Sequence, residues 1–230
     1  MKLNIKDTKF FLAGGCVRDK LLKRPFKDRD YVVLTPLAFT ELVAALEQEG
    51  AEVSQAKEEF LTIRAKKDGE VFDIAYPRVE GAYSDGRRPD SVSQTDSLRQ
   101  DSSRRDFTIN AMYKDENGNI LDFHGGQQDL KDELIRTVGD PYERFGEDAL
   151  RILRALRFAA QLGFSIEEAT AEAMARCMPL LKKESISADR IREESNKILL
   201  YQPNIFGWWR GQLPNLLQDK GLRLEVTAKK

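Results

Sequence analysis

The hydrophobic pattern changes near Pro141, and this change constrains the fold more than any other feature of the sequence. Up to that point, β-rich runs alternate with short amphipathic stretches and turns, which is typical of a mixed domain. Beyond it, apolar residues recur with a period of about 3.6 residues, as they do in helices. We therefore predict an α+β domain over residues 1–140, a helical domain over residues 141–200, and a short helical remnant over residues 201–230.

The first domain contains local signals for strands and helices in alternation. Strands are predicted over residues 10–14 and 31–34, because both runs are apolar and rich in aromatic or β-branched residues. A short helix is predicted over residues 17–22. A longer helix is predicted to run from Pro36 to Gly50, because proline favours a helix start and glycine a helix end.

Turn signals and polar composition describe the rest of this domain. The turns at KDGE (67–70) and Asn117-Gly118 each separate two β-rich runs, so both predict a hairpin. The stretch from Pro77 to Arg104 is polar and rich in Gly, Pro, Ser and Asp. It predicts a long mobile loop, and long loops within compact domains are often functional.

Composition excludes several classes of site. Charged residues make up 33% of the chain, yet the net charge is −1, so a nucleic-acid surface must come from local clusters. Cys16 and Cys177 are far apart, and His124 is the single histidine, which argues against a disulfide scaffold and against thiolate or histidine metal sites. With no apolar leader and no membrane-length run, we expect a soluble cytoplasmic protein that does not enter a membrane.

Two aspartates, Asp28 and Asp30, lie one residue apart at the start of the predicted strand YVVL. Strand side chains two residues apart point to the same face, so the two carboxylates should lie side by side. A divalent cation such as magnesium, held by one or two carboxylates and substrate phosphates, would offset their repulsion. The alternative is that both are surface aspartates paired with Lys27 and Arg29.

The segment GGCVRD, residues 14–19, lies upstream between a predicted strand and a helix. Gly14 and Gly15 would let the backbone approach a phosphate at the helix start, and Arg18 could add a charge-assisted contact. A Gly-Gly pair alone is a weak signal, but with the aspartate pair it places a phosphate site beside a metal site. That combination indicates phosphoryl or nucleotidyl transfer.

Two further segments carry candidate site residues. Asp73 alternates with apolar residues in EVFDIAY and is either a sheet-edge residue or a third catalytic carboxylate. In SSRRDFTINAM, Arg104 and Arg105 are candidates for triphosphate contacts and Asp106 for a ribose hydroxyl. Asp106 could equally cap the helix that follows.

Asp148, Arg151, Arg154 and Arg157 recur every three residues between apolar flanks, which predicts a stripe on one helix face. Charges in such a setting need an anionic or polar ligand. A carboxylate beside a guanidinium matches the amine and ring nitrogen shared by cytosine and adenine, and clashes with guanine and uracil. Asp148 with Arg151 is thus a plausible filter for C and A.

Taken in order, GGCVRD, KDRD, RRDFTINAM, EDALRILRALRFAAQLGF and SADRIREE resemble class II tRNA nucleotidyltransferases, the CCA-adding enzymes, and the related bacterial poly(A) polymerases. The resemblance covers about residues 10–200 and implies a polymerase-beta-like head with a mixed sheet, followed by an all-α neck. It implies specific roles for the residues singled out above. Asp28 and Asp30 would hold two magnesium ions, Gly15 and Arg18 would bind triphosphate, and Arg105 and Asp106 would bind triphosphate and ribose. Asp148 and Arg151 would template the base, with support from Arg154 and Arg157. The segment SADRIREE would brace the neck helix, with Ser187 or Asp189 as its cap and Glu193 and Glu194 among its partners.

The expected function is therefore template-independent addition of C and A, from CTP and ATP, to the 3′ end of tRNA. Addition of CC only, of A only or of a poly(A) tail uses the same chemistry and stays an alternative, as does a non-catalytic RNA-binding relic. Members of the family carry further helical body and tail domains that grip tRNA. Their absence here predicts a truncated chain or a short enzyme, with self-association or a partner chain completing the grip.

Overall fold

The structure is a computed structural model that describes residues 3–26, 29–182 and 184–201. Asp28, one of the predicted metal ligands, and nearly all of the predicted remnant at 201–230 lie outside the described residues. The chain divides into two compact units: Met1–Gly81 with Ser91–Leu130, and Ala82–Asp90 with Lys131–Lys230. The predicted domain boundary at residue 140 stays a proposal beside this division.

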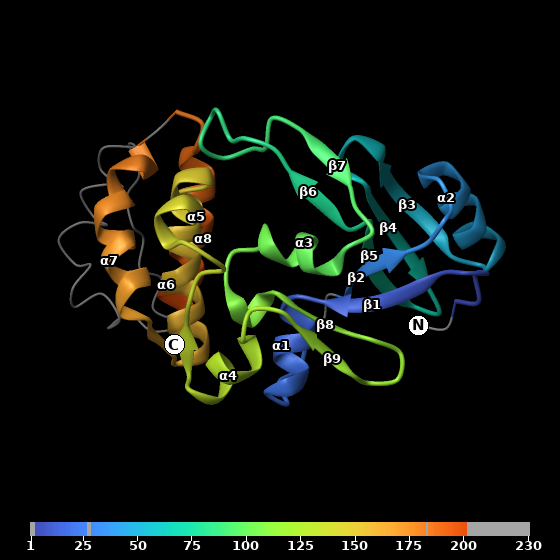
Figure 1. The fold of residues 1–230 in the computed structure, drawn as a ribbon, viewed down its shortest axis with the longest axis horizontal. Coiled ribbons are helices and arrows are strands. Elements are labelled where there is room, and N and C mark those ends of the chain that lie inside the picture. The colour runs from blue at the N-terminus through green and yellow to red at the C-terminus, as the bar shows by residue number, and fades with distance from the viewer. Residues whose placement is uncertain (1–2, 27–28, 183, 202–230) are drawn as a thin grey trace. The chain divides into compact units, whose positions relative to one another are not determined.

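The first unit is built on a seven-stranded mixed sheet (Figure 1). Strands β2 and β5 pair in parallel, and the other neighbouring strands pair antiparallel. The sheet order is β3-β4-β5-β2-β1-β8-β9. The strands are β1 (Lys9–Ala13), β2 (Arg29–Leu34), β3 (Glu52–Lys57), β4 (Thr62–Lys67), β5 (Glu70–Ala75), β8 (Met112–Lys114) and β9 (Ile120–Asp122). The predicted strands and both hairpins are confirmed, and so is the α+β class.

Helix α2 (Phe39–Gln48) covers one part of this sheet. Its Leu42 and Leu46 are fully buried in one cluster with Ile63 and Ile74 from β4 and β5. The helix begins three residues after the predicted start at Pro36, because the backbone N–H of Ala38 donates to the Glu41 carboxylate at 2.8 Å and so caps the first turn. Helix α1 (Gly15–Leu21) confirms the predicted short helix and starts one residue after Gly14.

The prediction of one long mobile loop over 77–104 is wrong for much of its length. Strand β6 (Arg78–Glu80) pairs with β7 (Val92–Gln94), and helix α3 (Leu98–Ser103) follows. The side chain of Ser97 caps α3 by accepting from the backbone of Gln100. Polar residues form these elements through caps and ion pairs, so the stretch lacks the hydrophobic periodicity that would reveal it.

The second unit is mainly helical, as predicted. It contains α5 (Pro141–Glu147), α6 (Leu150–Leu162), α7 (Glu168–Cys177) and α8 (Ala188–Tyr201), with a short 3-10 helix at Met178–Lys182. Helix α6 packs on α8, and α5 packs on α7 (Figure 1). A pair of two-residue strands, β10 (Leu134–Ile135) and β11 (Ser165–Ile166), adds a small parallel bridge.

Two short elements complete the described chain. A 3-10 helix at Thr108–Asn110 replaces the short helix expected in RRDFTINAM, and α4 (Gly126–Lys131) follows β9. Among the helices of the described residues, none combines the length and the apolar character that crossing a membrane requires.

Candidate active site

Asp30 lies near the start of β2 and faces the same side of the sheet as Asp73. The two residues are partners across the parallel β2–β5 pair, and Asp30 is exposed. The backbone N–H of Asp30 donates to the sulfur of Cys16 at 3.2 Å, which links β2 to helix α1. Within the described ranges no cluster of three acidic, histidine or cysteine side chains suits a metal ion, so a metal here would also need Asp28 or substrate oxygens.

Asp73 is engaged by an arginine on the neighbouring strand. Arg64 on β4 donates to both carboxylate oxygens of Asp73, each at 2.8 Å, and the two side chains are 50% and 39% exposed. The predicted alternation is confirmed, because Phe72 and Ile74 are buried on the other face. A catalytic role for Asp73 stays a prediction, and its carboxylate would have to leave a bidentate pair to perform it.

Gly14 and Gly15 form a tight turn against two guanidinium groups. Gly14 has φ 68° and ψ −132°, a conformation that residues with a Cβ rarely adopt. A Cβ at Gly14 would lie 3.0 Å from Nη1 of Arg105, and a Cβ at Gly15 would lie 3.4 Å from Nη2 of Arg18. The turn between Gly14 and Gly15, called the glycine turn below, therefore brings bare backbone up to two cations.

Arg18 is buried, and its guanidinium is held by two neighbours. It donates to both oxygens of Asp19, at 2.9 and 3.0 Å, and to Oδ1 of Asn110 at 2.7 Å. Nδ2 of Asn110 in turn donates to Oδ1 of Asp106 at 3.1 Å. Arg18 and Asp106, both predicted site residues, thus belong to one buried chain of hydrogen bonds whose connecting member, Asn110, we did not predict.

Arg104 and Arg105 follow α3 and converge on one buried carboxylate, that of Asp101. Arg104 also pairs with Glu80 at 3.1 Å. Arg105 stacks over the Tyr113 ring at 5.0 Å, and its Nη1 lies 3.4 Å from the backbone oxygen of Asn110. Burial works against the charge of Arg105, but Tyr113 and Asp101 outweigh it and raise the pKa of this guanidinium. Arg105 therefore stays charged beside the glycine turn.

In the second unit, Asp148 does not lie on the helix that carries the arginines. It ends α5 with an extended backbone, φ −144° and ψ 100°, and α6 begins at Leu150. Its carboxylate accepts the backbone N–H of Leu150 at 3.0 Å, which caps the start of α6. The predicted four-residue stripe on one helix is wrong in this respect, because the carboxylate competes for backbone donors and breaks the helix.

Each arginine of α6 has a specific environment. Arg151 is buried and donates to Glu147 at 2.7 Å, and Arg157 donates to Glu194 on α8 at 2.6 Å. Arg154 and Arg157 flank the ring of Phe158, at 5.4 and 4.1 Å. The predicted role of Glu194 as a partner of this helix is confirmed.

The other residues predicted for the bracing helix make contacts within α8 or at its start. Glu193 pairs within α8, with Lys197 at 2.7 Å. Ser187 supplies the backbone oxygen that accepts from Arg190 and Ile191 at the start of α8. Glu147 was not predicted, although its position four residues before Arg151 is the spacing of a helical ion pair.

Electrostatics make Asp148 unusual among the carboxylates of this unit. Burial raises the pKa of Asp148, while the Leu150 N–H, Arg151, Arg154 and Arg87 work in the opposite direction without cancelling the effect. Arg87 belongs to the segment 82–90, and it donates to the backbone oxygen of Ser185 at 3.0 Å. A half-buried carboxylate surrounded by arginines can read a donor and an acceptor on one ligand edge.

Comparison with known proteins identifies the class. Residues 10–136 match the family described as "Poly A polymerase head domain", and residues 163–203 match "Probable RNA and SrmB- binding site of polymerase A". The first match covers more than half of the chain, and the chain belongs to this nucleotidyltransferase family.

Individual relatives narrow the comparison to CCA-adding enzymes. The chain is 41% identical to the CCA-adding enzyme of Enterococcus faecalis over 199 residues, which covers 86% of this chain and 47% of that protein. It superposes on the Bacillus stearothermophilus CCA-adding enzyme in complex with CTP with a TM-score of 0.73 and 32% identity, covering 94% of this chain and 49% of the other. A tRNA nucleotidyltransferase complexed with a primer tRNA and an incoming ATP analogue gives 0.74 and 30%, covering 95% and 61%.

These matches confirm the predicted resemblance and the polymerase-beta-like head. The chain spans about half the length of the curated relatives it matches, such as 47% of the Enterococcus faecalis protein.

Proposed function

We propose that this chain carries the catalytic head and the base-reading neck of a template-independent nucleotidyltransferase that adds C and A, from CTP and ATP, to the 3′ end of tRNA. In this reaction the terminal hydroxyl attacks the α-phosphate, a new phosphodiester bond forms, and pyrophosphate leaves. The proposal is supported by the named relatives, whose structures contain CTP, an ATP analogue or tRNA. The RNA-binding match at 163–203 supports a tRNA partner.

The observation that carries the proposal is the buried network around Asn110. The side chain of Asn110 joins Arg18, beside the glycine turn, to Asp106. The backbone oxygen of Asn110 lies 3.4 Å from Nη1 of Arg105. Backbone without side chains, flanked by fixed cations, is what an incoming triphosphate requires. In this account Arg105 and Arg104 bind the triphosphate and Asp106 orients the ribose. Arg18 contributes through its hydrogen bond to Asn110.

Asp28 and Asp30 would hold the metal. Their carboxylates fit magnesium, because this ion takes oxygen ligands and is usually completed by substrate phosphates and water. Two such ions, when bound, would neutralise charge on the phosphates and activate the attacking hydroxyl. Asp30 lies on the exposed face of β2, on the same side as Asp73. Asp73 as a third carboxylate is tested by Asp73→Asn, which should lower turnover if the role is real.

Base selection is assigned to Asp148 and Arg151, supported by Arg154 and Arg157. Asp148 would accept from the exocyclic amine of cytosine or adenine, and Arg151 would donate to the ring nitrogen. Glu147 holds Arg151 in place at 2.7 Å, and Glu194 holds Arg157. The presence of all four charged residues favours specific recognition over a non-catalytic relic, because a relic would be expected to have lost some of them.

The experiment uses a series of tRNA transcripts that end before the first C, before the second C and before A. Each is incubated with one labelled nucleoside triphosphate at a time. CCA addition predicts C, C and A in turn and then arrest. Addition only of C, addition only of A, or continued A incorporation would assign the chain to one of the alternative activities. A cytoplasmic location is part of this proposal.

A further inference from the structure

The carboxylate of Asp101 on α3 is fully buried and is surrounded by donors from four residues. Its Oδ1 accepts from the backbone N–H of Arg78 at 3.1 Å and from Nε of Arg104 at 2.9 Å. Its Oδ2 accepts from the Tyr113 hydroxyl at 2.6 Å and from Nη2 of Arg105 at 3.2 Å. The acceptor capacity of the group is therefore used almost completely, and two of the donors are adjacent arginines.

A buried carboxylate is costly unless it is paired and hydrogen-bonded. Burial alone would raise the pKa of Asp101, but Arg105, Arg104 and the Tyr113 hydroxyl outweigh burial and lower it. Asp101 is therefore ionised at neutral pH. Its negative charge offsets the repulsion between two guanidinium groups that neighbour each other in sequence.

Asp101 also determines where Arg105 can point. The arginine is held at Nη2 by Asp101 and against the Tyr113 ring, so its Nη1 lies beside the glycine turn. Nε of Arg105 is buried and has no hydrogen-bond partner among the described residues. Long arginine side chains lose considerable rotamer freedom when fixed, and Asp101 supplies the interaction that fixes both of them before a ligand arrives.

We propose that Asp101 is a positioning residue that pre-orients Arg104 and Arg105 for the polyphosphate chain of the incoming nucleotide. The inference rests on the proposed function, since it assumes a nucleoside triphosphate at this site. In this role Asp101 acts through its ion pairs with the two arginines, which would contact the phosphates.

The test measures binding of three probes by calorimetry to the full chain: inorganic tripolyphosphate, CTP and cytidine. Asp101→Asn removes the charge and turns an acceptor into a donor facing the arginines. We expect tripolyphosphate and CTP to bind about tenfold more weakly, the scale of one charge-assisted contact, and cytidine to bind as before. Unchanged tripolyphosphate affinity in a folded Asp101→Asn variant would overturn the proposal. An equal loss for cytidine would also overturn it, because that pattern indicates general damage.

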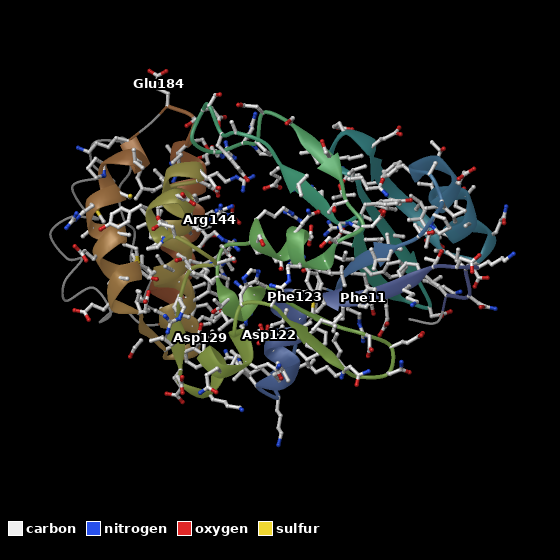
Figure 2. All side chains as sticks on the ribbon, viewed as in Figure 1. Phe11, Asp122, Phe123, Asp129, Arg144 and Glu184 are labelled. Carbon is white, nitrogen blue, oxygen red and sulfur yellow. The ribbon has the colours of Figure 1, made fainter. Side chains whose placement is uncertain are left out.

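A matched control is Asp129→Asn. Asp129, labelled in Figure 2, is 5% exposed on α4 and accepts from the Thr108 hydroxyl at 2.6 Å, so it is a buried, hydrogen-bonded acid of the same unit. It should lose stability without selective loss of tripolyphosphate binding. A loss in the control equal to that in Asp101→Asn would count against the positioning role.

If Asp101→Asn does not fold, Tyr113→Phe decides the question. It removes the 2.6 Å donor to Asp101 and keeps the carboxylate and the aromatic ring. A tripolyphosphate affinity lowered about threefold with cytidine unchanged supports the proposal, and unchanged affinity for both overturns it. None of these measurements uses tRNA or turnover. A chain whose tripolyphosphate affinity depends on Asp101 but which extends no tRNA would contradict the proposed function and leave this inference standing.

Discussion

Nη1 of Arg18 donates a 2.7 Å hydrogen bond to Oδ1 of Asn110, a residue 92 positions further along the chain. Arg18 is 4% exposed and Asn110 is 6% exposed, so water does not compete for this bond. The bond connects the glycine turn to the segment RRDFTIN, residues 104–110. Through Asn110 it also connects Arg18 to Asp106, which accepts from Nδ2 of Asn110 at 3.1 Å.

Asn110→Ala should therefore affect both stability and nucleotide binding. Arg18 and Asp106 would each lose a buried partner, at a cost of about 1–3 kcal/mol in the free energy of unfolding. Urea denaturation measures this cost, and the KM for CTP should rise. Asn119→Ala, in the exposed turn between β8 and β9, is the control and should change stability by no more than about 0.5 kcal/mol. A normal KM in Asn110→Ala would contradict the linking role.

Gly14→Ala should impair nucleotide addition more than it impairs folding. Alanine at this position meets Nη1 of Arg105 at 3.0 Å and occupies space that a phosphate would use. Gly50→Ala is the control, because Gly50 also has positive φ, +81°, but nothing lies within 4 Å of a Cβ there. Both variants should lose about 1–3 kcal/mol from backbone strain, with the larger loss at Gly14, because its ψ of −132° lies outside the left-handed helical region. Only Gly14→Ala should raise the KM for CTP, and equal KM values would show that the turn does not approach the ligand.

Asp30→Ala and Asp28→Ala should each abolish nucleotide addition. Asp30 is exposed, so its removal should leave the melting temperature nearly unchanged. Asp96→Ala removes another exposed carboxylate of the same unit and should keep normal turnover. Normal turnover by Asp30→Ala in magnesium would remove the proposed metal site.

Asp148→Asn should lose discrimination between CTP and UTP and gain stability at neutral pH. Burial raises the folded-state pKa of Asp148, so ionisation of this group opposes folding. The stability that it contributes is fully present below the unfolded pKa and is lost as pH rises through the raised folded pKa. Removing the ionisable group removes that loss. Thermal unfolding at several pH values, with labelled CTP and UTP incorporation, measures both effects, and retained selectivity would contradict the base-reading role.

Glu194→Ala should destabilise the helical unit strongly. It would leave Arg157 partly buried without its 2.6 Å partner, and breaking such a pair from one side costs about 3–5 kcal/mol. Glu193→Ala, one residue away, breaks an exposed pair with Lys197 and should cost less than about 1 kcal/mol. Chemical denaturation measures the free energy of unfolding of both variants. Similar losses would mean that burial of the Arg157–Glu194 pair adds nothing to its contribution.

Local turn chemistry made the hairpins predictable. Asp68-Gly69 and Asn117-Gly118 lie between β-rich runs, and the structure gives positive φ at Asp68, Gly69 and Gly118. Strand β3 was missed because its sequence EVSQAK is almost entirely exposed and carries no apolar alternation. It forms because it completes an edge of the sheet beside β4, which is a tertiary effect.

Candidate nucleotide-binding residues were easier to predict than the buried side chains that hydrogen-bond to them. Arg18, Arg105 and Asp106 were identifiable from glycines and charge clusters, but Asn110 and Asp101 were not. Both are joined to their partners by the fold: Asn110 to Arg18 across 92 positions, and Asp101 to Tyr113 across 12. The helix break at Asp148 was hidden because a spacing of three residues does not reveal a carboxylate that caps the following helix.

The most direct test of the central claim is extension of a tRNA transcript that ends before CCA, with all four nucleoside triphosphates and magnesium present. The mass of the RNA product identifies what was added. The account predicts a product longer by C, C and A, no U or G, and no product with Asp30→Ala. A folded protein that leaves the transcript at its original mass, or that adds U or G as readily as C, would contradict it.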